Sequence, residues 1–136
     1  MADTFDLEVA TPERLVFREA VTEAQLPAKN GYIGVLPGHA PLLSELGTGY
    51  ASYVSQGHKA YFALNGGFVE VLPDKVRVLA ETVEKAEEID VQRAQAALQR
   101  AQEQLSSPHV EMDPALALSA MFRAQARLEA AAQARK

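Results

Sequence analysis

The sequence contains no cysteine, so disulfide bonds and thiolate chemistry are excluded, and a zinc site would depend on histidine and carboxylates. It has no apolar run of the roughly 18–20 residues that spanning a bilayer requires. No basic arm offsets the net charge of −5, which argues against nucleic-acid binding. Residues 1–20 lack a basic-then-apolar leader, so no signal peptide is expected. A membrane would therefore matter only through a partner.

The composition changes sharply near residue 88. All 8 glycines and all 4 tyrosines precede this point, and an Ala/Gln/Arg-rich stretch without glycine follows it. Residues 1–89 carry a net charge of −6 (7 Lys/Arg, 13 Asp/Glu), and residues 90–136 carry +1 (6 and 5). This division predicts an α+β chain with a β-rich domain over 1–88 and a helical domain over 89–136.

The first part alternates apolar and polar residues in short runs, which is typical of half-buried strands. We expect about eight to ten strands in an antiparallel sandwich or flattened barrel. Asn30-Gly31 and Asn65-Gly66-Gly67 read as hairpin turns, and Pro27 is expected to end the third strand. The expected strands include 5–9, 15–17, 21–26, 50–54, 61–64, 68–72 and 76–80.

The second part predicts an antiparallel two-helix hairpin. Small apolar residues recur at helical spacing on both sides of a break at Ser106-Ser107-Pro108. Asp113-Pro114 is a typical helix start, with an N-cap aspartate followed by proline at the first helical position. The two apolar stripes are mostly alanine (Ala94, Ala97, Leu98, Ala101, Leu105; Ala117, Ala120, Met121, Ala124, Leu128, Ala131). Alanine offers one methyl group, so the hairpin should dock weakly and be able to open.

The most constrained stretch is residues 31–43, Gly-Tyr-Ile-Gly-Val-Leu-Pro-Gly-His-Ala-Pro-Leu-Leu. Its glycines and prolines predict a shaped loop flanked by short strands. It contains no nucleophile with an adjacent base, no metal-ligand spacing and no phosphate-binding glycine loop. His39 is therefore interpreted as a packed or interface histidine, and the stretch as a docking surface. An enzyme acting at His39 is the least favoured hypothesis.

Three stretches resemble the epsilon subunits of F-type ATP synthases. Residues 31–43 are similar to that family's G-x-x-G-[IV]-x-x-x-H-A-P-[LM]-[LI] loop, and residues 64–71 resemble the hairpin that follows it. Ile89-Asp90-Val91-Gln92-Arg93-Ala94 matches the family's I/L-D-x-x-R-A segment at the start of the first helix. The resemblance covers the whole chain and implies the same sandwich, boundary and helical hairpin.

The resemblance implies a rotor subunit of a proton-translocating enzyme, with no catalytic residue, metal or required cofactor of its own. The sandwich would connect the gamma subunit to the c-subunit ring, placing the chain on the cytoplasmic face of a bacterial plasma membrane as a peripheral protein. Extension of the hairpin would inhibit ATP hydrolysis by contact with the alpha and beta subunits. The implied ring contact is Tyr32, His39, Ala40, Pro41 and Leu42, and the implied inhibitory basic surface is Arg123, Arg127, Arg135 and Lys136.

Some members of this family also bind ATP between the two helices, which holds the hairpin down. By position, Ile89, Asp90, Arg93 and Ala94 would contact base and ribose, while Arg123 and Arg127 would hold phosphate. Residues i and i+4 of a helix point the same way, and guanidinium groups suit phosphate oxygens. Glu84 and Arg100 are further candidates. Glutamines at 95, 99 and 102 leave the first helix less positive than in strongly binding members.

Each of these residues has a simpler interpretation. Asp90 is also an ordinary helix N-cap, Arg93 and Arg100 are also typical of a solvated helix face, and the later arginines could serve inhibition without nucleotide. The alternative to a rotor subunit is an ATP-sensing module whose hairpin closes on bound nucleotide.

Overall fold

The computed structural model describes residues 3–106 and 113–136. These residues form ten strands, one 3-10 turn and two helices. The strands are β1 (Phe5–Ala10), β2 (Leu15–Val21), β3 (Glu23–Ala28), β4 (Gly31–Val35), β5 (Leu42–Glu45), β6 (Thr48–Ser55), β7 (His58–Asn65), β8 (Phe68–Val71), β9 (Lys75–Leu79) and β10 (Thr82–Lys85). The turn η1 (Ala86–Glu88) leads to α1 (Val91–Ser106) and α2 (Pro114–Ala134).

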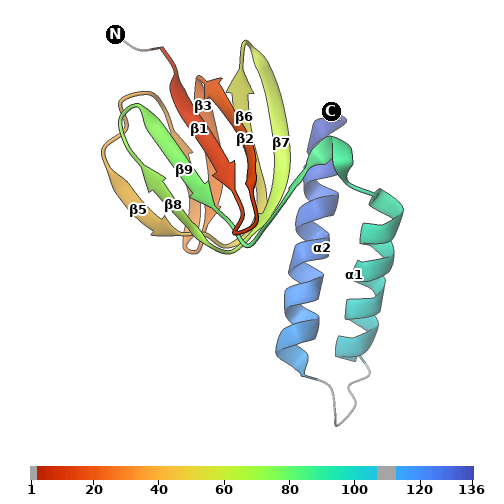
Figure 1. The fold of residues 1–136 in the computed structure, drawn as a ribbon. Helices are drawn as coiled ribbons and strands as arrows, with labels where there is room; N and C mark the ends of the chain where they lie inside the picture. Colours follow the sequence, from red (N-terminus) through yellow and green to blue (C-terminus); the bar gives the residue numbers. More distant parts are fainter. Residues whose placement is uncertain (1–2, 107–112) are drawn as a thin grey trace.

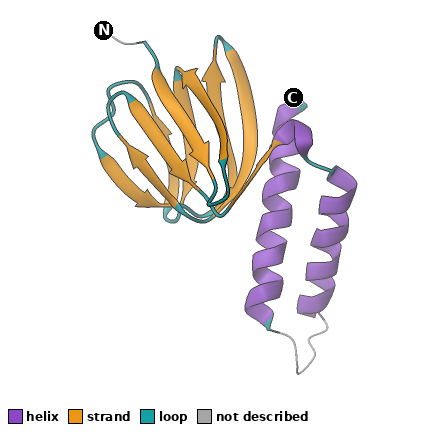
Figure 2. Ribbon diagram, viewed as in Figure 1, coloured by secondary structure: helices purple, strands orange, loops and turns teal. Residues whose placement is uncertain are grey.

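The strands form two five-stranded sheets that pack face to face (Figures 1 and 2). Sheet I has the order β2-β1-β9-β8-β5, and sheet II has the order β10-β7-β6-β3-β4. Successive residues of a strand point to opposite faces, and β1 accordingly alternates buried and half-buried residues along its length. The predicted sandwich is confirmed, and its number of strands lies within the expected range.

Side chains from both sheets fill the space between them. The largest of those with almost no exposed surface are Phe62, Leu7, Leu26 and Leu64, followed by seven valines. Burying a side chain of this size contributes roughly 1.5–3 kcal/mol. The aromatic ring of Phe17 packs on Phe62 and Tyr53 at centroid distances of 5.5 and 5.2 Å. The sandwich therefore has a core of its own that does not depend on the helices.

Three local predictions for the sandwich are wrong. Pro27 does not end the third strand but lies inside β3, opposite Tyr32 of β4. The missing N–H of Pro27 is tolerated because β3 pairs with β6 only over residues 23–25. A further strand, β10, follows the last predicted one and pairs with β7.

The third error concerns Asn65-Gly66-Gly67, which joins strands of different sheets. β7 belongs to sheet II and β8 to sheet I, so this turn carries the chain across the sandwich and does not form a hairpin. Gly66 and Gly67 have φ values of 63° and 98°. A Cβ atom on Gly67 would lie 1.9 Å from the carbonyl oxygen of Leu79, so glycine is required there for close packing as well as for conformation.

One strand pair is parallel. β1 pairs with β9 in parallel register, from Asp6 opposite Lys75 to Ala10 opposite Leu79, whereas every other strand pair among the described residues is antiparallel. The hairpin predicted at Asn30-Gly31 is present, and Gln56-Gly57 and Pro73-Asp74 are hairpin turns as well.

The two helices form an antiparallel hairpin beside sheet II. α2 lies between the sandwich and α1 (Figure 1) and contacts β6 and β7. Ala126 and Ala130 of α2 pack with Ala63, Tyr50 and Tyr61 of the sheet. On the other side of α2, the seam with α1 buries mainly alanines (Ala94, Ala101, Ala117, Ala124, Ala131). The described part of α1 ends at Ser106, and the predicted break at Ser107-Pro108 lies outside the described residues.

Candidate functional site

A cavity of about 400 Å³ lies where the sandwich meets the two helices, and we call it the hinge pocket. The linker between η1 and α1 comprises residues 89–90. The pocket is lined by Glu84 of β10, Glu88 of η1, Asp90 of the linker, Arg93, Ala94, Ala97 and Arg100 of α1, and Arg127 of α2. Its volume falls within the roughly 300–1,000 Å³ that is typical of small-molecule sites. The turn η1 and the linker reverse the direction of the chain before α1 begins. This reversal brings the start of α1 near β10 and α2, and the pocket lies between these elements.

The start of α1 is fixed by Asp90. Its carboxylate accepts a hydrogen bond from the backbone N–H of Arg93 at 3.1 Å, and its carbonyl accepts one from Ala94 at 3.0 Å. Asp90 is therefore the N-cap of α1, one of the two roles that its position in the sequence allowed. The cap also orients the first turn, so that Arg93 and Ala94 both line the hinge pocket.

The structure brings together four of the six predicted nucleotide-binding residues. Asp90, Arg93, Ala94 and Arg127 line the hinge pocket. Ile89 instead packs with the alanine and tyrosine side chains between α2 and sheet II. Arg123 lines an adjoining cavity of about 210 Å³, which it shares with Glu84 and Arg127, and its Nη1 donates to the hydroxyl of Ser119 at 2.6 Å.

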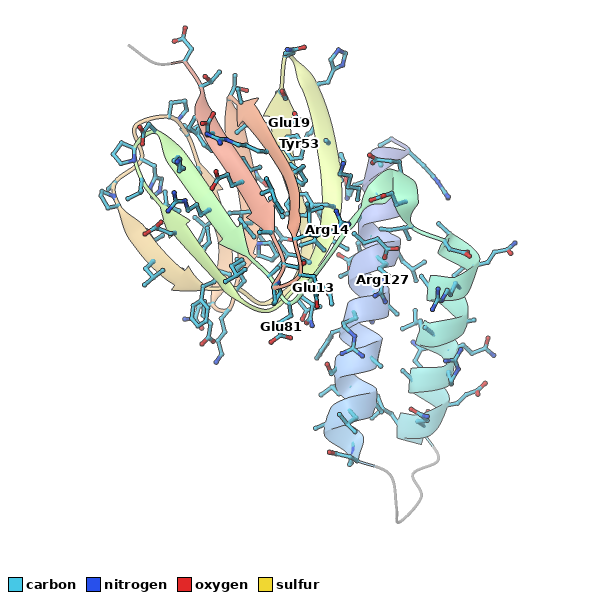
Figure 3. All side chains as sticks on the ribbon, viewed as in Figure 1. Glu13, Arg14, Glu19, Tyr53, Glu81 and Arg127 are labelled. Atoms are coloured by element: carbon cyan, nitrogen blue, oxygen red, sulfur yellow. The ribbon has the colours of Figure 1, made fainter. Side chains whose placement is uncertain are left out.

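Arg127 is held by a carboxylate. Its Nε donates to Oε1 of Glu84 at 2.9 Å, and about a third of each side chain is exposed. Figure 3 labels Arg127 on α2, at the level where β10 runs towards η1. The pocket thus combines three arginines with three carboxylates. Guanidinium groups of this kind bind phosphate oxygens well, whereas the carboxylates reduce the attraction for an anion.

The loop between β4 and β5 is pinned to a neighbouring turn. The N–H of Gly38 donates to the carbonyl of Pro73 at 2.8 Å, and Gly38 has φ 83°. His39 is half-buried, and its Nδ1 lies 2.6 Å from the carbonyl oxygen of Ala40. Ala40, Pro41 and Leu42 are exposed. Four of the five residues predicted for the ring contact therefore lie along one edge, three of them exposed, at the end of the sandwich where β1 begins.

Tyr32 does not join that edge. It lies on β4, where its hydroxyl donates to the carbonyl of Tyr50 at 2.6 Å. It lines a cavity of about 320 Å³ together with Phe122 and Glu129 of α2. Burial, with Tyr50 and the charge of Glu129 nearby, raises the pKa of Tyr32 to about 12. The structure thus places Tyr32 at the junction between sandwich and hairpin.

The predicted basic surface is divided in this conformation. Arg127 is paired with Glu84, and Arg123 is half-buried beside the sandwich. Arg135 and Lys136 are exposed beyond the end of α2. In the described conformation these four residues therefore do not form one exposed basic surface.

The sequence analysis missed an apolar surface on the outside of sheet I. Leu15, Phe68 and Leu79 are each more than half exposed. Strand register places them in one row, since Leu15 is opposite Ala10, Ala10 opposite Leu79, and Leu79 opposite Phe68. The signal was available in the sequence, because Phe68-Val69 and Val78-Leu79 put apolar residues at consecutive strand positions and hence on both faces.

A row of ion pairs borders this apolar surface. Glu8 lies between Arg18 and Arg77, at 3.6 and 3.2 Å, and Arg77 lies 3.8 Å from Glu70. Sheet I therefore presents an apolar row beside an alternating charged row, which is the composition of a protein contact surface with a polar rim.

Two further observations concern residues 3–106 and 113–136. Neither helix in these ranges is long and apolar enough to cross a membrane. No group of three or more histidine, aspartate or glutamate side chains in them is arranged to hold a metal ion.

Comparison with protein families gives two matches that cover most of the chain. The family model described as "ATP synthase, Delta/Epsilon chain, beta-sandwich domain" matches residues 4–86, and "ATP synthase, Delta/Epsilon chain, long alpha-helix domain" matches residues 87–132. These models meet near the hinge.

Individual relatives agree with the family matches. The ATP synthase epsilon chain of Solibacter usitatus is 58% identical over 131 residues, which is 96% of this chain and 98% of the relative. The epsilon chain of Koribacter versatilis is 54% identical over 107 residues, covering 79% of this chain and 75% of the relative. A chain in the Euglena gracilis mitochondrial ATP synthase structure has a TM-score of 0.84 at 24% identity, covering 97% of this chain and 83% of that one, which shows a shared fold.

Proposed function

The chain belongs to the ATP synthase delta/epsilon chain family, and from this premise we propose that it is a non-catalytic central-stalk subunit of a proton-translocating F-type ATP synthase. The sequence resemblance on which this function was predicted is confirmed by the family matches over both parts of the chain. The finer roles below are supported by the geometry of the described residues.

The observation that carries the proposal is that one sandwich presents two free surfaces in different directions. The apolar row of Leu15, Phe68 and Leu79 faces outward from sheet I, while the edge from His39 to Leu42 lies at one end of the sandwich. A subunit that transmits rotation must contact two partners at once through a body that does not deform. The large-residue core between the sheets supplies that rigidity.

We assign the two surfaces to two partners. The apolar row, with its charged border, suits the gamma subunit, because a rotor contact must stay together under load and apolar area provides most of the stability of such contacts. The edge formed by His39, Ala40, Pro41 and Leu42 suits the polar loops of the c-subunit ring. The chain would then be a peripheral protein on the cytoplasmic face of a bacterial membrane, held there by its partners.

The hairpin is proposed to regulate ATP hydrolysis. In the described conformation α2 covers sheet II through small side chains, mainly Ala126 and Ala130. Because these side chains bury little apolar area, releasing α2 from sheet II costs little free energy. Release would free Arg123 and Arg127 to join Arg135 and Lys136 in a basic face, which would suit acidic segments of the alpha and beta subunits.

The coupling role is tested by binding to the gamma subunit. Phe68→Glu and Leu79→Glu each place a charge in the apolar row, and we expect about tenfold or greater weakening measured by calorimetry. Leu116→Glu is the matched control, because Leu116 is 70% exposed on α2, away from sheet I. Unchanged gamma binding in both sheet I variants would contradict the assignment of this surface.

The regulatory role is tested in the assembled enzyme. A chain that stops after residue 88 should still assemble, because the sandwich core does not include the helices, and ATP hydrolysis should then lose its inhibition. An enzyme that assembles with this shortened chain but remains inhibited would refute regulation by the hairpin.

A second candidate function, a nucleotide-sensing hairpin, is favoured by the hinge pocket, which collects Asp90, Arg93, Ala94 and Arg127 in one cavity. ATP held there would touch both helices and η1 and would stabilise the docked hairpin. Calorimetric titration should give saturable ATP binding that weakens about tenfold or more in Arg93→Ala, because a charged hydrogen bond is lost. Arg18→Ala, on sheet I, is the control. Absence of binding at millimolar ATP would eliminate this candidate.

A further inference from the structure

A single ion pair connects the two sides of the hinge. Glu84 lies on β10, the last strand before η1, and Arg127 lies on α2, 43 residues further along the chain. Among residues 3–106 and 113–136, theirs is the only side-chain hydrogen bond or ion pair that joins the sandwich to the hairpin. We propose that the Glu84–Arg127 pair is a latch that holds the hairpin on the sandwich.

The position of the pair gives it control over hinge opening. β10 is an edge strand of sheet II and runs directly into η1, so Glu84 is fixed to the sandwich immediately before the chain bends. Arg127 lies one residue from Ala126, which is buried between α2 and the sheet. Any rotation of the hairpin away from the sheet about η1 and the linker separates the two side chains.

The remaining contacts are poorly suited to fixing one docked position. Ala126 and Ala130 meet Ala63 and two tyrosine rings, and methyl groups on flat rings make non-directional contacts. The hydrogen bond from Nε of Arg127 to Oε1 of Glu84 is directional and has a length of 2.9 Å. The ion pair therefore favours one docked position of the hairpin. The alanines contribute buried apolar area without fixing that position.

The latch is weak enough to open. Both side chains are about one-third exposed, at 35% and 37%, so water and salt compete for the two charges. Pairs in such surroundings typically shift an equilibrium by about two- to five-fold. A latch of this strength biases the hairpin without locking it, which is the property that a regulatory element requires. The inference rests on the proposed regulatory function, because it presumes that the hairpin opens.

The test measures the ratio of open to docked hairpin in the full chain without nucleotide. The chain has no native cysteine, so Glu13→Cys and Gln95→Cys, both at exposed positions, give one label on the sandwich and one on α1. The distribution of distances between the two spin labels then gives the fractions of open and docked hairpin. Glu84→Gln and Arg127→Gln should each raise the open-to-docked ratio about two- to five-fold.

The double variant and the charge swap identify the pair as the cause. Glu84→Gln combined with Arg127→Gln should open the hairpin no more than either single change does, because one interaction is removed in all three. Glu84→Arg combined with Arg127→Glu should restore docking. Arg100→Gln is the matched control, since Arg100 lines the same pocket but has no ion pair among the described residues. Added salt should open the unmodified hairpin and have less effect on Glu84→Gln.

The outcomes separate the latch from the proposed function. An open state that is populated but equally frequent with and without Glu84→Gln would overturn the latch and leave hairpin regulation standing. Additive effects in the double variant would overturn it as well. A hairpin that stays docked in every variant would overturn both the latch and the regulatory opening on which it rests.

Discussion

The sandwich and the hairpin are stabilised by side chains of very different size. The space between the two sheets is filled by Phe62, leucines and valines, whereas both sides of α2 bury alanines. A buried leucine or phenylalanine contributes roughly 1.5–3 kcal/mol, and a single buried methyl or methylene group contributes about 0.8 kcal/mol. The same chain thus contains a part that must keep its shape and a part that is attached by little free energy. The sandwich is therefore the rigid part of the molecule, and the docking of the hairpin is the contact that costs least free energy to break.

The largest expected effect is a loss of folding stability when the sandwich core is changed. Phe62→Ala removes a ring that is 1% exposed and contacts Phe17 and Tyr53, so the free energy of unfolding should fall by about 3–5 kcal/mol. Chemical denaturation followed by tyrosine fluorescence measures it. The unfolding of the helices should be unaffected until the sandwich melts. A loss below 1 kcal/mol would show that the core is not the main source of stability.

A smaller effect is expected where the hairpin meets the sandwich. Ala130 is fully buried, and Ala130→Leu adds three carbons that the interface cannot hold, so docking should weaken by about 1–3 kcal/mol. Small-angle scattering should detect expansion of the chain while the melting of the sandwich stays unchanged. Ala132→Leu, an exposed position on the same helix, is the control. Equal effects from both substitutions would mean that the alanine interface has no special role.

The start of α2 offers a test within the hairpin alone. Asp113 accepts a hydrogen bond from the N–H of Ala115 at 2.9 Å, and Pro114 occupies the first helical position. Asp113→Ala should cost about 0.5–2 kcal/mol of local helix stability, visible as faster hydrogen exchange in the first turns of α2. Asp113→Asn retains an acceptor and should restore most of the protection. Exchange in the strands should not change.

The smallest effect concerns Tyr32, which links the two regions. Its pKa is raised to about 12 from 10.0, mainly by burial and further by Tyr50 and Glu129, so the folded state holds this proton more tightly than the unfolded state. The resulting stability is complete below pH 10 and is lost as the pH rises towards 12. Tyr32→Phe should reduce this loss of stability at alkaline pH. Burial also raises the pKa of Tyr53 to about 12, so absorbance titration of the variant should retain one late-ionising tyrosine.

The sequence predicted elements well wherever one periodicity dominated. The alanine spacing gave both helices, and alternation gave most strands, because each pattern reports one buried face. β10 was missed, since Thr82-Val83-Glu84-Lys85 is short and mostly polar and is a strand because β7 pairs with it. The sheet change at Gly66-Gly67 was also missed. A turn motif reports local conformation, whereas the partner of the following strand is decided by packing elsewhere.

Site residues that are close in sequence could be grouped from the sequence, whereas residues that meet only through folding could not. Asp90, Arg93 and Ala94 are close in sequence, so their joint position at the hinge pocket followed from helix geometry. The partner of Arg127 did not, because Glu84 is 43 residues away and meets it only through docking of α2. Tyr32 was grouped with His39 by proximity in sequence. Alternation along β4 instead directs its side chain towards α2.

The parallel pairing of β1 with β9 has a consequence for synthesis of the chain. Glu8 and Arg77 are bonded across 69 residues, so β1 remains without its neighbour β9 until almost the whole sandwich has been translated. Such distant pairings are slow to form. The helices follow the sandwich in the chain, so translation order favours completion of the two sheets before α2 can dock on sheet II.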